Sequence, residues 1–257
     1  MAKKHDIIWL ESVDSTNEEC RRRISDIDNL SVVAALSQTS GKGQRGNVWL
    51  SEAGQNLTFS IVLKFPAKGL KAEMEPMLAY DQFVLSEITS LAIVDLLADF
   101  GIEAKIKWPN DIYIGDRKIC GILIENSLRG EWLQHSIIGI GLNVNQKAFS
   151  DDLPNPISMA QATGREFDRE EVLQTVATSL MARYEQLREG GAKELQADYH
   201  QRLYRLGQEH CYALPDGSRF RGIIRGVEPT GALRIENERG ELLSFLFKEV
   251  EFVIQGR

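Results

Sequence analysis

The chain has 257 residues, of which 43% are hydrophobic and 26% charged, with a formal net charge of -7. This acidic balance argues against a nucleic-acid-binding surface, and no run of 18 or more apolar residues predicts a membrane span. Three widely spaced cysteines without a CxxC pair and four scattered histidines predict neither a disulfide framework nor a zinc site. We expect a soluble, cytoplasmic protein with one large and one small domain.

The N-terminal segment predicts a strand over residues 7–10 followed by a helix. Ser15 and Glu18 have the spacing of a capping box, which places the helix start at Ser15-Thr16-Asn17-Glu18. These side chains either cap the helix or contact a ligand. The two roles are compatible, because a helix N-terminus also receives carboxylates and polar ligand groups.

A glycine-rich loop, SQTSGKGQRGNVW, covers residues 37–49 and joins two predicted strands. The apolar run 32–36 is typical of a strand covered on both faces, and alternation over 57–65 predicts a half-buried strand. Glycines allow close backbone approach, and cationic side chains add positive charge, so the loop is suited to holding an anion. It lacks the P-loop pattern, and a hairpin connection with solvated charges is the alternative.

A long helix and a short strand follow. Residues 77–100 carry apolar side chains at helical spacing, and Gly101 is a suitable stop. Over 103–108, the alternation predicts a strand with Lys105 and Lys107 on the face opposite the apolar residues. The two lysines either contact a ligand in a functional site or are exposed to solvent. The sequence WPND at 108–111 then predicts a turn, because the residue before proline stays extended.

Two further strands carry glycines on one face. Residues 112–125 predict a hairpin in which Gly121 leaves one face open. In the next strand, period two separates an apolar face from a row formed by Gly139, Gly141, Asn143 and Asn145. Because glycines weaken a strand, this row indicates close approach by a ligand or another backbone. Tight packing against a neighbouring helix is the alternative.

The remainder predicts helices and then a small β-domain. Residues 149–167 read as a loop with a short helical turn near 158–162, and Asp168 and Glu171 have capping spacing before a long helix. Another helix covers about 192–206. From residue 208 onward, short strands between turns predict a five-stranded SH3-like barrel. We therefore predict an α+β protein with domains at 1–207 and 208–257: a mixed β-sheet with flanking helices, plus a small C-terminal SH3-like β-barrel.

Five motifs, in this order, resemble those of the biotin protein ligases: DSTN at 14–17, the glycine-rich loop, KWPND at 107–111, RKICGIL at 117–123 and GIGLNVN at 139–145. They are specific as a set, and with the C-terminal barrel the resemblance covers essentially the whole chain. It implies a catalytic domain of the class II synthetase and biotin-lipoyl ligase type. Because the motifs begin by residue 14, we expect the form without the N-terminal DNA-binding domain of some members.

The resemblance implies that biotin and ATP form biotinyl-5′-adenylate, which then acylates one lysine of a biotin carboxyl carrier domain of a carboxylase. The first step brings a carboxylate to the α-phosphate, so Mg²⁺, lysine and backbone N–H groups must neutralise like charges. Water must also be excluded, because adenylates hydrolyse readily.

The resemblance also assigns site residues. The expected catalytic residues are Lys118, which in the family contacts the biotin carboxyl and the α-phosphate, Lys107, and Asp111, which is also the expected metal ligand. The expected biotin-binding residues are Ser15, Thr16, Asn17, Gln38, Gly41, Lys42, Gly43, Gln44, Lys118, Gly121 and Gly139. The expected ATP- and adenylate-binding residues are Lys42, Gln44, Arg45, Trp49, Lys107, Asn110, Gly141 and Asn143.

One part of the loop departs from the family pattern. It commonly reads GRGRxG, whereas Lys42 and Gln44 stand here in the two arginine positions. Lysine keeps the charge without the bidentate fork and glutamine loses the charge, which bears on how strongly the adenylate is retained.

Two alternatives remain at this point: a lipoate protein ligase or octanoyl transferase, and a non-catalytic biotin-sensing protein. KWPND, RKICGIL and the barrel favour biotin, and an intact Lys118 favours catalysis. No nucleic-acid or membrane partner is expected. Edge strands of the main sheet could pair two copies into a homodimer or pair with the carrier domain.

Overall fold

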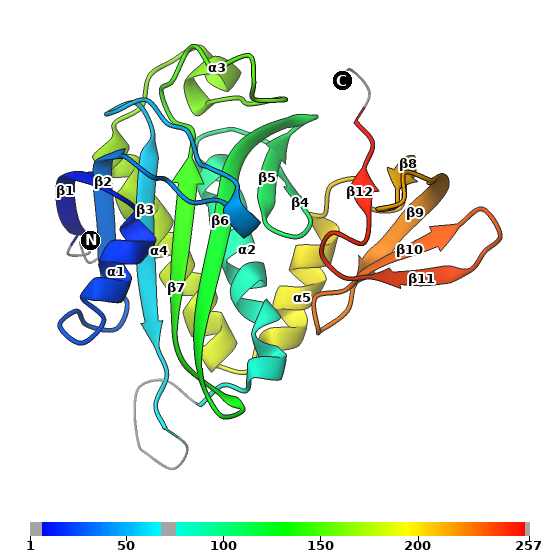
Figure 1. Cartoon of the computed structure of the whole chain (residues 1–257), viewed down its shortest axis with the longest axis horizontal. Helices are drawn as coiled ribbons and strands as arrows, with labels where there is room; N and C mark the ends of the chain where they lie inside the picture. The colour runs from blue at the N-terminus through cyan, green and yellow to red at the C-terminus, as the bar shows by residue number, and fades with distance from the viewer. Residues whose placement is uncertain (1–6, 68–75, 255–257) are drawn as a thin grey trace.

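The chain forms two β-sheets, and helices lie on both faces of the larger one (Figure 1). The computed structural model describes residues 7–67 and 76–254. The larger sheet has seven strands in the order β1-β2-β3-β7-β6-β5-β4. Its strands are β1 (Ile7–Val13), β2 (Val32–Gln38), β3 (Leu57–Lys64), β4 (Lys105–Lys107), β5 (Asp111–Ile114), β6 (Arg117–Arg129) and β7 (Trp132–Leu142).

The strand pairing confirms the predicted mixed sheet. β1 and β2 are parallel, whereas all other neighbouring strands are antiparallel. The glycine-rich loop connects β2 to its antiparallel neighbour β3, as expected. At the far edge, Ile106 of β4 forms a parallel bridge with Leu203, so the chain that leads to the second sheet covers this edge.

Helices of unequal length cover the two faces. Figure 1 shows three helices behind the sheet, α2 (Phe83–Asp99), α4 (Arg169–Arg188) and α5 (Ala192–Gln201), and the short α1 (Thr16–Arg22) in front of it. The main core joins the back face of the sheet to these three helices. A smaller core lies on the α1 side and consists of Cys20, Ile27, Val33, Val62 and Ile137.

Because α1 covers the front face, β3 differs from the half-buried strand expected from its alternation. Its polar positions Thr58 and Ser60 are 4% and 0% exposed, so both faces of this strand are buried. The alternation was correct, but the polar side faces buried polar groups instead of solvent.

Of the helix caps predicted from the sequence, the one at Asp168 is confirmed and the one at Ser15 is wrong. Asp168 caps α4, because its side chain accepts hydrogen bonds from the backbone N–H groups of Glu170 and Glu171. The short helix α3 (Met159–Thr163) begins with a complete capping box. The capping box predicted at Ser15 and Glu18 is wrong: Ser15 is the N-cap of α1 but makes no side-chain cap, and the Glu18 carboxylate pairs with Lys42 and Arg21.

Five short strands form the second sheet, in the order β11-β10-β9-β8-β12. This antiparallel sheet is consistent with the predicted SH3-like domain. It packs on the part of the chain that forms the larger sheet through Trp108, whose Nε1 donates to the carbonyl of Gly231 at 2.9 Å. Among the described helices, none has both the length and the apolar character required to cross a bilayer. The strands are β8 (Glu209–Ala213), β9 (Arg219–Val227), β10 (Leu233–Asn237), β11 (Leu242–Phe245) and β12 (Glu251–Phe252).

Candidate active site

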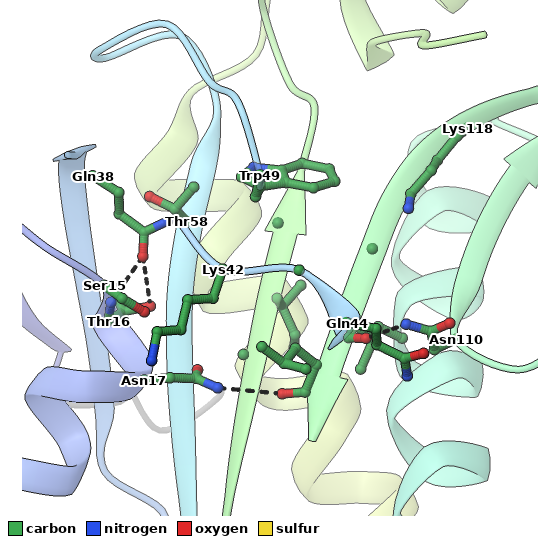
Figure 2. A pocket seen from close by; sticks show the side chains of 17 residues that line it. Ser15, Thr16, Asn17, Gln38, Lys42, Gln44, Trp49, Thr58, Asn110 and Lys118 are labelled. Atoms are coloured by element: carbon green, nitrogen blue, oxygen red, sulfur yellow. Dashed lines mark hydrogen bonds between the residues drawn. The ribbon is translucent and has the colours of Figure 1, made fainter. Parts of the chain in front are cut away.

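A small cavity of about 60 Å³ lies on the front face of the sheet, between α1, the glycine-rich loop and strands β3, β7 and β6. Figure 2 shows Gln38, Thr16 and Asn17 on one side of it and Lys118 and Asn110 on the other, with Trp49 between them. The structure thus brings together every residue predicted for biotin binding except Gly41. The lining residues are Ser15, Thr16, Asn17, Gln38, Lys42, Gly43, Gln44, Trp49, Thr58, Asn110, Lys118, Gly121, Ile122, Leu123, Gly139, Ile140 and Gly141.

Hydrogen bonds fix the polar side of this cavity. Gln38 Oε1 accepts from the backbone N–H of Thr16 at 2.8 Å, and Ser60 Oγ lies 2.7 Å from Thr16 Oγ1 and 2.6 Å from Asn17 Oδ1. Asn17 Nδ2 donates to Glu125 Oε2 at 2.7 Å. Because these groups are buried or half-buried, their orientations are set before any ligand enters. Sequence reasoning missed Ser60 and Glu125, although the alternation of β3 and β6 could have placed them on this face.

The glycines of β7 and β6 make room for two side chains of the protein itself. A Cβ atom at Gly139 would lie 2.3 Å from Asn17 Oδ1, and one at Gly141 would lie 2.3 Å from Trp49 Cε2. At Gly121 the Cβ atom would lie 3.0 Å from Trp49 Cζ3. The sequence predicted close approach by a ligand or another backbone at this row. In the structure the approaching groups are the Asn17 amide and the Trp49 indole.

A second, larger cavity of about 450 Å³ adjoins the first and shares Trp49 and Lys118 with it. It collects the predicted residues Lys107, Asp111 and Asn143. The other lining residues are Asn47, Val48, Leu50, Tyr113, Phe149, Leu153, Pro154, Asn155 and Pro156. The predicted site residues therefore divide between two adjoining cavities: Gln38 lines the smaller one, Asn143 lines the larger one, and Lys118 lines both.

Charged and aromatic groups meet where the cavities join. Lys118 Nζ lies 2.7 Å from Asp111 Oδ1 and 5.7 Å from the centre of the Trp49 ring. Lys107 Nζ lies over the rings of Tyr113 and Phe252, 5.2 and 4.8 Å from their centres. The Phe252 contact brings a residue of the second sheet to the site. Aromatic faces attract ammonium groups, so these contacts help to hold both lysine side chains in place.

The backbone of Lys118 is held by hydrogen bonds to a segment further along the chain. The N–H of Lys118 donates to the carbonyl of Asn155 at 2.7 Å, and its own carbonyl accepts from Ile157 at 3.0 Å. The loop-like segment 149–167 therefore pairs with the start of β6. Asn143 contributes to the same support, because its Nδ2 donates to the carbonyl of Ile157 at 3.0 Å. The Asn143 amide nitrogen therefore already makes a hydrogen bond within the protein.

The glycine-rich loop is attached to α1 by an ion pair. Lys42 and Arg21 both pair with Glu18, and the hydrogen bonds from Arg21 and Lys42 lower the pKa of the Glu18 carboxyl. Within the loop, a Cβ atom at Gly41 would lie 2.5 Å from the carbonyl oxygen of Trp49. Arg45 belongs to a 3-10 turn, Gln44–Gly46, and its side chain lies outside what the structure describes.

Two buried polar atoms in the site have no hydrogen-bond partner among the described residues: Trp49 Nε1 and Gln44 Oε1. Buried polar groups of native proteins are almost always paired. One free donor and one free acceptor on residues that line the small cavity therefore indicate groups that a ligand would satisfy.

Comparison with known proteins decides the family. The model of the Biotin/lipoate A/B protein ligase family matches residues 9–143, which include the first four motifs and the first five residues of the fifth. The chain belongs to this family. A Paracoccus denitrificans biotin--[acetyl-CoA-carboxylase] ligase is 31% identical over 238 residues, which cover 90% of this chain and 94% of that protein.

Other members of the family include a longer relative and a solved structure. The bifunctional ligase/repressor BirA of Bacillus spizizenii is 30% identical over 215 residues, and the match spans 62% of its length and 81% of this chain. The biotin protein ligase from Aquifex aeolicus, solved in complex with biotin and ATP, superimposes with a TM-score of 0.77 at 27% identity. That match covers 96% of this chain and 99% of the Aquifex chain, so this ligase fold includes the second sheet.

Proposed function

We propose that this protein is a biotin protein ligase, which activates biotin with ATP and transfers it to a lysine of a biotin carboxyl carrier domain. The observation that carries the proposal is the meeting of two cavities at Lys118. One has a polar wall suited to the ureido group of biotin, and the other has the volume of a nucleotide site. An amine group that reaches both can neutralise a carboxylate and a phosphate at once.

Biotin occupies the smaller cavity in this proposal, which must enlarge to admit it. Sites for small molecules have volumes of about 300 to 1,000 Å³, whereas this cavity measures about 60 Å³. The Trp49 indole, which fills the space above Gly141 and Gly121, is the largest side chain that could move aside. Its unpartnered Nε1 then becomes available to a ligand.

The first half-reaction joins the biotin carboxylate to the α-phosphate of ATP. A carboxylate oxygen attacks the phosphorus, the bond to the bridging oxygen of the β-phosphate breaks, and pyrophosphate leaves. Both reactants are anions, so Lys118 between them lowers the barrier by offsetting their repulsion. Lys107, which lines the larger cavity, adds a second positive charge on the nucleotide side.

Asp111 fits the metal role that the family implies. Mg²⁺ is usually held by one or two carboxylates together with substrate phosphates and water. Among the described residues no group of three or more His, Cys, Asp or Glu side chains could hold a metal ion, so a dedicated cage is absent from this part of the chain. The single carboxylate of Asp111 beside the larger cavity fits an Mg²⁺ ion whose other ligands come from the phosphates of ATP and from water. When bound, Mg²⁺ would offset phosphate charge.

The second half-reaction transfers biotin to the carrier. The lysine amine of the carrier domain attacks the carbonyl of the mixed anhydride, and AMP leaves. Until then the adenylate must be kept from water, and the loop that α1 holds through Glu18 and Lys42 covers the site. Since Leu203 covers the β4 edge, a carrier segment or a second copy that paired with the sheet would add beside β1.

Pyrophosphate exchange tests the activity. Purified protein with ATP, Mg²⁺ and biotin should exchange labelled pyrophosphate into ATP, and adding a carrier domain should yield biotinylated carrier. Lys118→Ala should abolish both activities, whereas Lys147→Ala, an exposed lysine paired with Glu166, should leave them unchanged. Exchange that depends on lipoate instead of biotin, or normal turnover by the Lys118→Ala protein, would overturn the proposal.

A further inference from the structure

A third cavity, of about 410 Å³, lies behind the sheet between α2, α4 and α5. None of its lining residues contributes to the two cavities at Lys118. Its walls are largely apolar and include Phe65, Met77, Val84, Leu187 and Pro229. Its volume falls within the range of small-molecule sites.

Ionisable side chains interrupt these apolar walls, and one carboxyl group among them, that of Glu87, is buried. Glu87, in the middle of α2, lines the cavity but is only 4% exposed, and its Oε1 has no hydrogen-bond partner among the described residues. The hydroxyl of Tyr199 on α5 is likewise buried and unpartnered within the described chain. Burial raises the pKa of Glu87 to about 7. The remaining ionisable side chains around the cavity are Asp81, Tyr184, Arg188 and Lys193.

A buried carboxylate is stabilised by a hydrogen-bond donor, and most strongly by a cationic one. Arg188, the guanidinium at this cavity, lies 3.1 Å from Glu185. Lys193 is an exposed residue near the start of α5, so its ammonium can stay in water. An ammonium ligand could therefore reach Glu87 through the apolar cavity while its hydrocarbon part contacts the walls.

We propose that this cavity binds a small primary amine with an apolar body, whose ammonium group pairs with the Glu87 carboxylate. The site is separated from the biotin and ATP cavities by the sheet, so it constitutes a second ligand site on the same protein. Its existence does not depend on the ligase reaction. A membrane or macromolecular partner is not required, because the recognising group lies inside the fold.

Isothermal titration calorimetry on the full chain can test the proposal with two probes of nearly equal shape, 2-phenylethylamine and 2-phenylethanol. We expect the amine to bind at least about tenfold more tightly than the alcohol, since a charge-assisted bond to a buried carboxylate is worth at least that factor. Glu87→Gln should remove this preference and leave alcohol binding within about twofold, because the side-chain shape is kept.

Two controls show whether the amine preference depends on Glu87 itself and whether the variant is folded. Asp81→Asn removes a negative charge from the exposed rim of the same cavity and should change amine affinity less than about twofold. Biotin-dependent pyrophosphate exchange by Glu87→Gln should match the unmodified protein, which verifies that the variant is folded. Equal binding of the two probes, unchanged amine affinity in Glu87→Gln, or no saturable binding of the amine would each overturn the proposal.

Discussion

Replacing Glu87 with glutamine should change how stability depends on pH. Burial raises the pKa of this carboxyl from 4.5 to about 7 in the folded protein, whereas in the unfolded chain it is solvated and titrates near its ordinary value. The difference corresponds to about 3 kcal/mol of folding free energy, at about 1.4 kcal/mol for each pH unit between the two values. Because the folded-state pKa is the higher one, this stability is fully present below about pH 4.5 and is lost as the pH rises through about 7.

Glutamine keeps the shape of the side chain and removes its titration. We therefore expect the free energy of unfolding of Glu87→Gln to rise relative to the unmodified protein by about 2 to 3 kcal/mol between pH 5 and pH 8. Urea unfolding followed by circular dichroism at both pH values measures this difference, and taking the difference between the two proteins cancels the groups that they share. Asp81→Asn, at an exposed position, is the matched control.

Parallel stability profiles for the two proteins, differing by less than about 0.5 kcal/mol across this range, would show that the Glu87 carboxyl is not desolvated as its burial implies. The same result would weaken the amine site, because an already solvated carboxylate gains little from an incoming ammonium group.

Three further predictions concern the loop and the strands beneath it. Gly141→Ala places a Cβ atom 2.3 Å from Trp49 Cε2, in the space that the small cavity must gain to admit biotin, so kcat/KM for biotin-dependent exchange should fall about tenfold or more; an unchanged value would show that biotin does not use this space. Gln44→Arg adds a charge beside the site and should slow adenylate release, and equal dissociation rates in a filter-binding assay would reject this. Glu18→Gln breaks the pair with Lys42 and should lower the free energy of unfolding by no more than about 1 kcal/mol, with a larger loss in urea unfolding as the contrary result.

Much of the site could be predicted because short-range periodicity fixes which face a strand residue occupies. Period two alone placed Lys107 opposite the buried Ile106 and Trp108, and it placed Gly139 and Gly141 together on one side of β7. The turns at WPND and at 115–117 set the register of the hairpin that carries Lys118. These features depend on residues that are close in sequence.

What the sequence did not reveal depends on contacts between distant segments. The buried state of Ser60 follows from α1 packing over β3, and the missing cap at Ser15 follows from Glu18 pairing with a lysine 24 residues away. Trp49, which lines both cavities, lies against Gly141 on a strand far away in the sequence. Periodicity within one strand contains no information about which side chain will lie against its glycines.

A single aromatic ring that borders both cavities has a thermodynamic consequence for the two substrates. Displacing the Trp49 indole to admit one ligand reshapes the wall offered to the other, so the two binding equilibria are linked and not independent. Linkage is reciprocal: whatever factor biotin applies to the affinity for nucleotide, the nucleotide must apply to the affinity for biotin. Cooperativity between the substrates would then be carried by the rotation of one side chain, without any movement of domains.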